Sequence, residues 1–381
     1  MKTFERCLKI DLDENNAFFL WGPRKSGKTT YLREKYPDAL WFDLLDTRLQ
    51  YEFALHPYKL RETILATHPA LAIIDEVQKA PKLLDEIHWC LENTSTKFIL
   101  CGSSAKSLKR GAANLLGGRA WRYEMYPLTS LEIPNFDLNR ALNHGLLPQH
   151  YLSNKPDPFL KGYVLEYLHE EVQKEASVRN VMAFERFLDM VAKTHGQLIN
   201  YANIARDCGV SAPTVRSYFQ ILEETLLGFR LSPWAESKSR KLIETEKFYL
   251  FDVGLVRSLL GLTVIEPGTD VYGRAFEHFI LQEIRAYLAY KENPLKLSYW
   301  RTTSQFEVDI IVGNMDLAIE CKATRDVRSS TLKGLAVLQH EEVVKQSLVI
   351  SLESKPRKLL NGILILPYSQ FLKELWEGQW V

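Results

Sequence analysis

Residues 22–29 restrict the fold of this chain more than any other segment. They read Gly-Pro-Arg-Lys-Ser-Gly-Lys-Thr, which is the G-x-x-x-x-G-K-T pattern of a phosphate-binding loop. The apolar run 17–21 before the loop predicts a buried strand, and the segment 29–36 after it predicts the start of a helix. A basic glycine-rich turn is the alternative, but it would not require these flanks. The segment therefore predicts an α/β domain in which the loop joins a strand to a helix N-terminus.

The residue types in this loop suit a bound phosphate chain. Two glycines permit a tight turn and a close approach of the backbone to the ligand. We expect the lysine to reach the β- and γ-phosphates, and the threonine hydroxyl after it to bind Mg²⁺. The predicted nucleotide contacts are Gly22, Pro23, Arg24, Lys25, Ser26, Gly27, Lys28, Thr29 and Thr30.

An acidic pair provides the second part of a hydrolytic site. The run 71–74 is continuously apolar, as in a strand that is buried on both faces of a parallel sheet, and it ends in Asp75 and Glu76. At the tip of such a strand Asp75 is expected to complete the Mg²⁺ shell, and Glu76 to polarise the attacking water. An acidic cap on a strand end is the alternative interpretation.

A third apolar strand, 97–101, ends in Gly-Ser-Ser. Ser103 or Ser104 is placed to sense the γ-phosphate from the neighbouring strand, although either is equally suited to be a helix N-cap. Further along, a glycine pair precedes Arg119. An arginine that reaches the transferring phosphoryl group contributes strongly to catalysis, and a surface arginine is the alternative.

The order of these motifs resembles a widespread prokaryotic family of AAA-type ATPases fused to a C-terminal domain of unknown function. The resemblance runs along nearly the whole chain, through the loop, Ile-Ile-Asp-Glu-Val-Gln-Lys-Ala-Pro to residue 81, Leu-Cys-Gly-Ser-Ser to residue 104 and Leu-Gly-Gly-Arg to residue 119. It implies ATP and Mg²⁺ as cofactors and Arg119 as an arginine finger. One departure is Cys101, where a threonine is expected. The family roles implied for the ATP site fall on Gly22, Lys28, Thr29, Asp75 and Glu76.

Composition favours a reduced cytoplasmic protein of two or three domains. The 381 residues carry a net charge of +1, which argues against a nonspecific coat on nucleic acid. The five cysteines form no C-x-x-C pair, so neither a disulfide framework nor a zinc site is expected. We find no signal pattern and no apolar run that would span a membrane, so we expect no membrane partner. Assembly into a homo-oligomer is compatible with the sequence.

We expect an ATPase domain over residues 1–135, a helical linker with a winged helix-turn-helix over 136–240, and a nuclease-like domain over 241–381. The stretch 134–158, rich in Pro, Asn and His, interrupts the periodicity and predicts the first junction.

The middle part contains a helix-turn-helix pattern that resembles a winged helix. Residues 201–208 and 211–222 have helical periodicity, with a glycine turn between them, Ser211 as N-cap and Pro213 in the first turn. Side chains of types that suit double-stranded DNA point outward, and a basic run follows at 238–241. A module that serves only for packing is the alternative. The inward set is Val215, Phe219 and Leu222, and the outward set is Thr214, Arg216, Ser217 and Gln220.

Two C-terminal strands, 306–312 and 317–322, carry a cluster of charges. Period-two alternation predicts one apolar face with Val308, Ile310, Val312, Leu317, Ile319 and Cys321, and a polar face with Glu307, Asp309, Glu320 and Lys322. A two-residue turn at 314–315 would pair Val312 with Leu317, Ile310 with Ile319, and Asp309 with Glu320. Carboxylates that lie opposite each other are unfavourable in a sheet unless a cation lies between them.

The spacing D-x₁₀-E-x-K is that of the PD-(D/E)XK nuclease core, in which two acids bind Mg²⁺ and the lysine assists the attacking water. Glu277 lies on an apolar helical stripe with Leu281, Ile284 and Leu288, and is expected to join the same metal site. Nuclease catalysis is assigned to Asp309, Glu320 and Lys322. A nuclease fold that has lost activity and serves for binding is the alternative.

These patterns together predict an ATP-binding, Mg²⁺-dependent ATPase. Hydrolysis by Lys28, Glu76 and Arg119 would drive a conformational change in a DNA-interacting C-terminal region. The alternatives are an ATP-gated, metal-dependent DNA nuclease and a non-hydrolysing nucleotide switch that binds protein partners.

Overall fold

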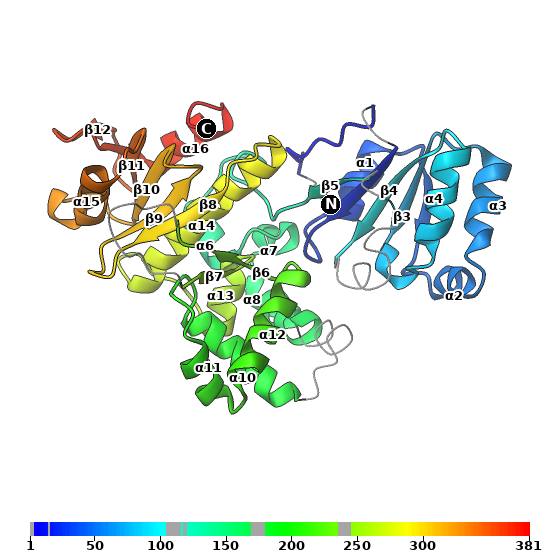
Figure 1. Ribbon diagram of the computed structural model, residues 1–381, viewed down its shortest axis with the longest axis horizontal. Coiled ribbons are helices and arrows are strands. Elements are labelled where there is room, and N and C mark those ends of the chain that lie inside the picture. Colours follow the sequence, from blue (N-terminus) through cyan, green and yellow to red (C-terminus); the bar gives the residue numbers. More distant parts are fainter. Residues whose placement is uncertain (1–3, 14–15, 104–115, 117–119, 169–179, 235–244) are drawn as a thin grey trace.

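The computed structural model describes residues 4–13, 16–103, 116, 120–168, 180–234 and 245–381. The first third of the chain forms one end of the molecule, and the last third forms the other (Figure 1). The middle third packs below and between them, in green. The long helix α14 (Asp270–Tyr290) crosses the centre.

The first third is built on a five-stranded parallel sheet in the order β2-β3-β4-β1-β5. The strands are β1 (Ala17–Trp21), β2 (Leu40–Asp43), β3 (Leu71–Asp75), β4 (Lys97–Gly102) and β5 (Ala120–Glu124). The connecting helices are α1 (Lys28–Lys35), α2 (Thr47–Leu55), α3 (Tyr58–Thr67), the 3₁₀ turn η1 (Val77–Lys79) and α4 (Leu83–Asn93). The predicted parallel sheet is confirmed.

Both faces of this sheet are buried, which explains why its strands are continuous apolar runs. Phe18 and Ile73 belong to the core on one face, and Ile74 and Phe98 belong to the core on the other; all four are fully buried. Successive side chains of a strand alternate between the two cores, so in the inner strands β1, β3 and β4 polar residues are confined to the strand ends. These ends carry the candidate site.

The middle third is mostly helical. Its elements are α6 (Leu138–His144), α7 (Pro148–Leu152), α8 (Pro156–Gly162), the π-helical turn η2 (Tyr163–Leu168), α10 (Val181–Lys193), α11 (Tyr201–Cys208), α12 (Ala212–Glu224), β6 (Gly228–Leu231), β7 (Lys247–Leu250) and α13 (Val253–Leu259). The stretch 134–158, where the first junction is expected, contains short helices. Two of them begin at a proline, which is tolerated there because the first N–H of a helix needs no internal partner.

The helix-turn-helix pattern is present as two helices. Ser211 caps α12 by accepting a hydrogen bond from the Thr214 amide, and Gly209 takes the left-handed conformation between the helices, with φ of 68°. The following strands β6 and β7 are antiparallel: Gly228 pairs with Leu250 at one end, and Leu231 pairs with Lys247 at the other. This pairing spans residue 240, the expected boundary, so β7 packs with the middle third.

The last third is a six-stranded mixed sheet in the order β12-β13-β11-β10-β9-β8. Its strands are β8 (Leu297–Arg301), β9 (Glu307–Val312), β10 (Leu317–Lys322), β11 (Gln346–Ser351), β12 (Arg357–Lys358) and β13 (Leu364–Pro367). The helical elements are α14, η3 (Ser329–Thr331), α15 (Lys333–Glu341) and α16 (Tyr368–Trp376). α14 packs on β10 and α16 of the last third and on α13 and α6 of the middle third, and so joins these two parts of the chain. No helix in the described ranges is long and apolar enough to cross a bilayer.

The register of β9 and β10 agrees with the sequence, but the expected faces need one correction. Val312 pairs with Leu317 and Ile310 with Ile319, as predicted. Val308, however, packs in the opposite core from Ile310. Against β8 the register shifts by one residue between Ser298 and Trp300, as a β-bulge produces. The extra residue in β9 reverses the alternation, so Val308 changes face.

Candidate functional site

The loop of residues 22–29 lies where β1 passes into α1, at the carboxyl edge of the parallel sheet. Gly27 has φ of 99°, a conformation that side chains of L-residues rarely adopt. A Cβ atom at Gly22 would lie 2.5 Å from the backbone carbonyl of Met125. Both glycines are therefore required by the path of the backbone, as the pattern predicted.

Lys28 and Thr29 are held by the loop and by the next strand. The Lys28 ammonium donates to the carbonyls of Gly22 at 2.7 Å and Pro23 at 3.0 Å, and the residue is only 6% exposed. The Thr29 hydroxyl donates to the Asp75 carboxylate at 2.7 Å, and Asp75 is buried at the tip of β3. Two side chains from separate motifs thus meet at one point.

The site meets three requirements of a nucleotide with its Mg²⁺. At Gly22 there is no room for a side chain, and Gly27 has a φ that L-residues rarely adopt, so the loop presents backbone amides that can approach a phosphate. The buried Ser26 hydroxyl has no hydrogen-bond partner in the described residues, which leaves a polar group available at the loop. Thr29 and Asp75 supply the oxygen ligands that Mg²⁺ prefers. Arg24, Lys25 and Thr30 are partly or fully exposed around this cradle.

Glu76 follows Asp75 in a left-handed conformation, with φ of 58°. Its carboxylate accepts a short hydrogen bond from the side-chain amide of Gln78, and the same amide nitrogen lies 3.3 Å from the hydroxyl of Ser103. Gln78 therefore joins the acidic pair to the end of β4. Sequence reasoning did not select Gln78; the available signal was its place two residues after the acidic pair.

Of the other residues that the sequence placed near the loop, Cys101 is described by the structure, whereas Ser104 and Arg119 are not. Cys101 lies directly across from Asp75 in the register of β3 and β4. Burial and then the Asp75 carboxylate raise the pKa of the Cys101 thiol, so the thiol stays protonated beside the site. Ser104 and the expected arginine finger Arg119 lie outside the described residues.

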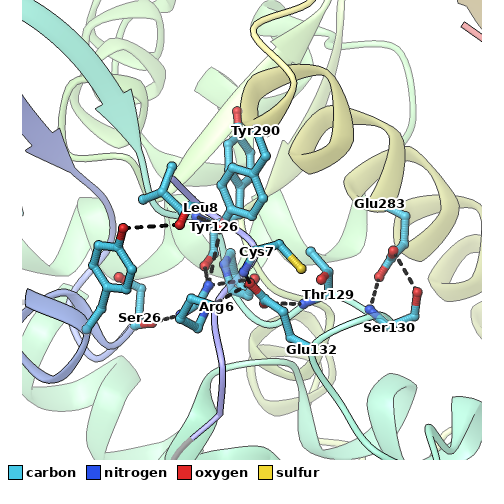
Figure 2. A network of polar contacts seen from close by, with 12 residues as sticks. Arg6, Cys7, Leu8, Ser26, Tyr126, Thr129, Ser130, Glu132, Glu283 and Tyr290 are labelled. Carbon is cyan, nitrogen blue, oxygen red and sulfur yellow. Dashed lines mark hydrogen bonds and ion pairs between the residues drawn. The ribbon is translucent and has the colours of Figure 1, made fainter. Parts of the chain in front are cut away.

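Residues from outside the sheet also contact the loop. Arg6 donates to the Ser26 carbonyl at 2.6 Å, to the Tyr126 carbonyl at 2.6 Å and to the Glu132 carboxylate at 3.0 Å (Figure 2). It also lies 3.3 Å from the hydroxyl of Tyr290 at the end of α14. A single buried side chain thus links the phosphate-binding loop to the long helix of the C-terminal third.

Glu132 and Glu283 continue this link. Glu132 also accepts from the amides of Cys7 at 2.7 Å and Thr129 at 3.0 Å, and its side chain has no exposed area. Glu283 of α14 accepts from the amide and the hydroxyl of Ser130 (Figure 2). It also accepts from the Trp376 indole. Burial raises the pKa of Glu283 to about 7, although these hydrogen bonds oppose the change.

The side chains of α12 that were expected to face DNA are exposed or half-buried, and two of them also contact neighbouring side chains. Val215, Phe219 and Leu222 are buried, as predicted. Of the outward set, Arg216, Ser217 and Gln220 are exposed and Thr214 is half-buried. Arg216 stacks on Tyr201, 5.0 Å from its ring centre, and Gln220 donates to Glu224. The basic run at 238–241 lies outside the described residues.

The C-terminal charges lie in one cluster, with partners that the sequence did not indicate. Asp309 accepts from the Cys321 amide at 2.7 Å, and Lys322 pairs with Glu320 at 2.6 Å. The buried Lys247 of β7 lies 2.6 Å from Glu307 and 3.5 Å from Glu277. The hydroxyl of Tyr249, also on β7, donates to Glu277 at 2.5 Å. The cluster is thus completed by a strand of the middle third.

Electrostatics in this cluster differ between the acids and the lysines. Burial, then Glu320 and Glu277, raises the pKa of Asp309 well above its usual value. Burial alone would lower the pKa of Lys247, but the carboxylates around it, led by Glu277, raise it instead. Internal lysines therefore balance much of the acidic charge. In the part of the chain that the structure describes, no three or more His, Cys, Asp or Glu side chains are arranged to hold a metal ion.

Comparison with protein families divides the chain into three parts. Residues 14–133 match the model of an AAA domain. Residues 135–266 match a domain of unknown function, DUF8612, and residues 272–371 match another, DUF4143. The Arg6 contact lies before the first of these matches.

The chain is similar to uncharacterized proteins of other organisms. A protein of Mycobacterium tuberculosis is 28% identical over 317 residues, which cover 80% of this chain and 69% of that protein. A protein of Methanocaldococcus jannaschii is 22% identical over 380 residues, which cover 90% of this chain and 82% of that protein.

Two solved structures are similar in part. The Walker-type ATPase PABY2304 of Pyrococcus abyssi has a TM-score of 0.44 and 16% identity, covering 65% of this chain and 92% of that chain. The ORC1 protein of Aeropyrum pernix in complex with DNA has a TM-score of 0.26 and 12% identity, covering 64% of this chain and 86% of that chain. By these family matches, an AAA domain in the first third of the chain is followed by two domains of unknown function.

Proposed function

We propose that this protein hydrolyses ATP with Mg²⁺ and uses the cycle to change the conformation of a C-terminal region that contacts DNA. The observation that carries the proposal is the 2.7 Å hydrogen bond between the Thr29 hydroxyl and the Asp75 carboxylate. Thr29 follows the loop lysine directly, and Asp75 is the first residue of the acidic pair. The two motifs therefore already meet where a P-loop ATPase holds its metal.

Each residue of the site has a role that follows from its position. Lys28 would bind the β- and γ-phosphates, because its ammonium is buried against the loop and its charge is directed at the cradle. Thr29 and Asp75 would hold Mg²⁺, which when bound supplies positive charge to the transferring phosphoryl group. Glu76 would accept a proton from the attacking water and orient it. Arg119 is proposed to stabilise the same phosphoryl charge.

Contacts between the loop and the other domains supply a route for coupling. Arg6 bonds the Ser26 carbonyl, and the Tyr163 hydroxyl lies 3.3 Å from the Arg24 carbonyl. Both carbonyls belong to the loop that would close around a nucleotide. A change in loop geometry would alter the contact with α14 through Arg6 and the contact with η2 through Tyr163. Domain rearrangement on nucleotide binding follows from these two contacts.

The proposal for DNA rests on the exposed face of α12. Arg216, Ser217 and Gln220 lie on that face, and these side chains bond phosphates and base edges. The pairing of β6 with β7 after α12 agrees with a winged-helix arrangement. Double-stranded DNA is therefore the proposed partner.

The test is phosphate release from ATP and Mg²⁺, with and without double-stranded DNA. We expect turnover by the unaltered protein, its loss in Glu76→Gln, and normal turnover in Asp309→Ala. ATP binding should persist in Glu76→Gln, because the loop is unchanged. Stimulation by DNA that is lost in Arg216→Ala would support DNA as the partner. ATP binding without turnover under any condition would instead indicate a non-hydrolysing switch that binds protein partners.

A metal-dependent DNA nuclease, gated by ATP, is the second candidate. It is suggested by the charge cluster of Glu277, Asp309, Glu320 and Lys322 from α14, β9 and β10. In the described residues these acids are not arranged to hold a metal ion, so a nuclease would require them to move closer together when Mg²⁺ binds. Nuclease activity of this kind should survive Lys28→Ala and disappear in Asp309→Ala or Lys322→Ala. DNA cleavage by these three variants with Mg²⁺ tests it directly.

A further inference from the structure

We propose that Gln78 is a positioning residue for hydrolysis, holding the water-activating Glu76 and the Ser103 hydroxyl through one side-chain amide. The inference rests on the proposed ATPase function and adds a residue to its machinery. Gln78 does not touch the phosphate loop in the described contacts, so its effect is exerted through Glu76 and Ser103.

The backbone brings Gln78 back towards Glu76. Glu76 has the left-handed φ of 58°, which a non-glycine residue adopts only at a cost, and it directly precedes the 3₁₀ turn η1. Within this turn Gln78 lies two residues further on, and its amide reaches the Glu76 carboxylate. The residue with the strained backbone is thus Glu76, whose carboxylate must keep a fixed direction to activate water.

Gly102 makes room for this arrangement. A Cβ atom at Gly102 would overlap the side-chain oxygen of Gln78 and would lie 2.7 Å from the Trp21 ring. Gly102 is the last residue of β4, directly before Ser103. The end of β4 is therefore shaped to receive the Gln78 side chain.

The hydrogen-bond pattern fixes the orientation of the amide. The Gln78 nitrogen serves two acceptors, a Glu76 oxygen and the Ser103 hydroxyl. The Gln78 oxygen is buried without a partner in the described residues. A buried acceptor without a partner is unfavourable, so its presence indicates that the two contacts made by the nitrogen are worth more than that cost.

This arrangement gives the two oxygens of Glu76 different tasks. Its Oε2 is held by Gln78, and the described contacts give Oε1 no partner. Oε1 can then accept a proton from water that attacks the γ-phosphate. Because Ser103 shares the same amide, contact between Ser103 and the γ-phosphate would be transmitted to Glu76. Holding a catalytic group in place commonly contributes about 10²-fold to a rate.

The test compares Gln78→Ala and Gln78→Met in ATP turnover and in ATP binding. Met keeps the length and packing of the side chain but cannot donate a hydrogen bond. We expect kcat to fall about 10- to 100-fold in both variants, while KM and the Kd for ATP with Mg²⁺ change less than about threefold. Gly102→Ala should lower kcat in the same way, because it displaces an unchanged Gln78. The double variant Gln78→Ala/Gly102→Ala should be no slower than the slower single variant.

Each outcome separates this inference from the function on which it rests. Turnover by the unaltered protein that is unchanged in Gln78→Ala would overturn the role of Gln78 alone. Normal turnover in Gln78→Met with loss in Gln78→Ala would also overturn it, since packing would then be sufficient. A parallel loss of ATP binding in Gln78→Met would indicate a structural role and reject positioning. No turnover by the unaltered protein would overturn both the ATPase function and this inference.

Discussion

Replacing Arg6 by alanine should loosen the junction between the phosphate-binding loop and the C-terminal third. The Arg6 and Glu132 side chains are 4% and 0% exposed, and they are 3.0 Å apart. Removal of Arg6 leaves Glu132 as a buried charge whose remaining hydrogen-bond donors, among the described residues, are the amides of Cys7 and Thr129. It also removes donors from the Ser26 and Tyr126 carbonyls.

The magnitude follows from the burial of the pair. Breaking a buried ion pair by removing one partner costs about 3–5 kcal/mol, because the remaining charge is uncompensated. Glu132→Gln removes that charge, so the double variant Arg6→Ala/Glu132→Gln should recover part of the loss, with a coupling of about 1–3 kcal/mol. Arg48→Ala is the matched control. Its partner Asp46 is paired at 3.5 Å on the surface, where Arg48 is 91% exposed, and no measurable change is expected.

Native-state hydrogen exchange is the appropriate assay, because a chain of several domains need not unfold in one step. The amides of Cys7, Thr129 and Tyr126 report on the junction directly, since they bond Glu132 or Tyr290. We expect their protection to fall by a factor of about 10² or more in Arg6→Ala. Protection equal to that of the unaltered protein, or a double variant that simply sums the single ones, would refute the reasoning.

Two further predictions concern Glu283 and Gly22. Burial raises the pKa of Glu283 to about 7, above its unfolded value, so folding favours the protonated acid and stability should fall as pH rises from about 4.5 to 7. Denaturant unfolding of Glu283→Gln should lack this decline, and an identical pH profile in both proteins would contradict the assignment. Gly22→Ala should abolish nucleotide binding measured by calorimetry, because its Cβ would meet the Met125 carbonyl at 2.5 Å. Gly162→Ala, where no atom lies within 4 Å of the added Cβ, should bind normally, and tight binding by Gly22→Ala would exclude the steric argument.

The parallel sheet of the first third was predictable because each of its strands can be recognised from a short segment of sequence. Each strand is a continuous apolar run, and a parallel sheet buried on both faces requires such runs. The observed β1 and β4 agree with the expected segments to within one residue. The meeting of Thr29 with Asp75 was also foreseeable, because the carboxyl ends of parallel strands lie at one edge of the sheet, and only β4 separates β1 from β3.

Features that depend on distant pairing were not predictable from one sequence. Lys247 reaches Glu307 of β9 because β6, the partner strand of β7, packs against β8, and nothing near Lys247 in the sequence indicates this. Val308 lies in the opposite core from Ile310 because the register between β8 and β9 shifts by one residue. A prediction from strict period-two alternation contains no such shift. The role of Gln78 similarly depends on the left-handed turn at Glu76.

Helix α14 fixes the spacing of contacts on three different parts of the molecule. Glu277 lies with the acids of β9, His278 contacts His195 at 3.1 Å, Glu283 holds Ser130, and Tyr290 reaches Arg6 and the Tyr126 amide. From Glu277 to Tyr290 the axis advances by about 20 Å at 1.5 Å per residue. One residue inserted within this span would rotate all later side chains by about 100° and separate the contacts on its two sides. Natural variation in length should therefore be confined to the loops, and α14 should tolerate substitutions more readily than insertions or deletions.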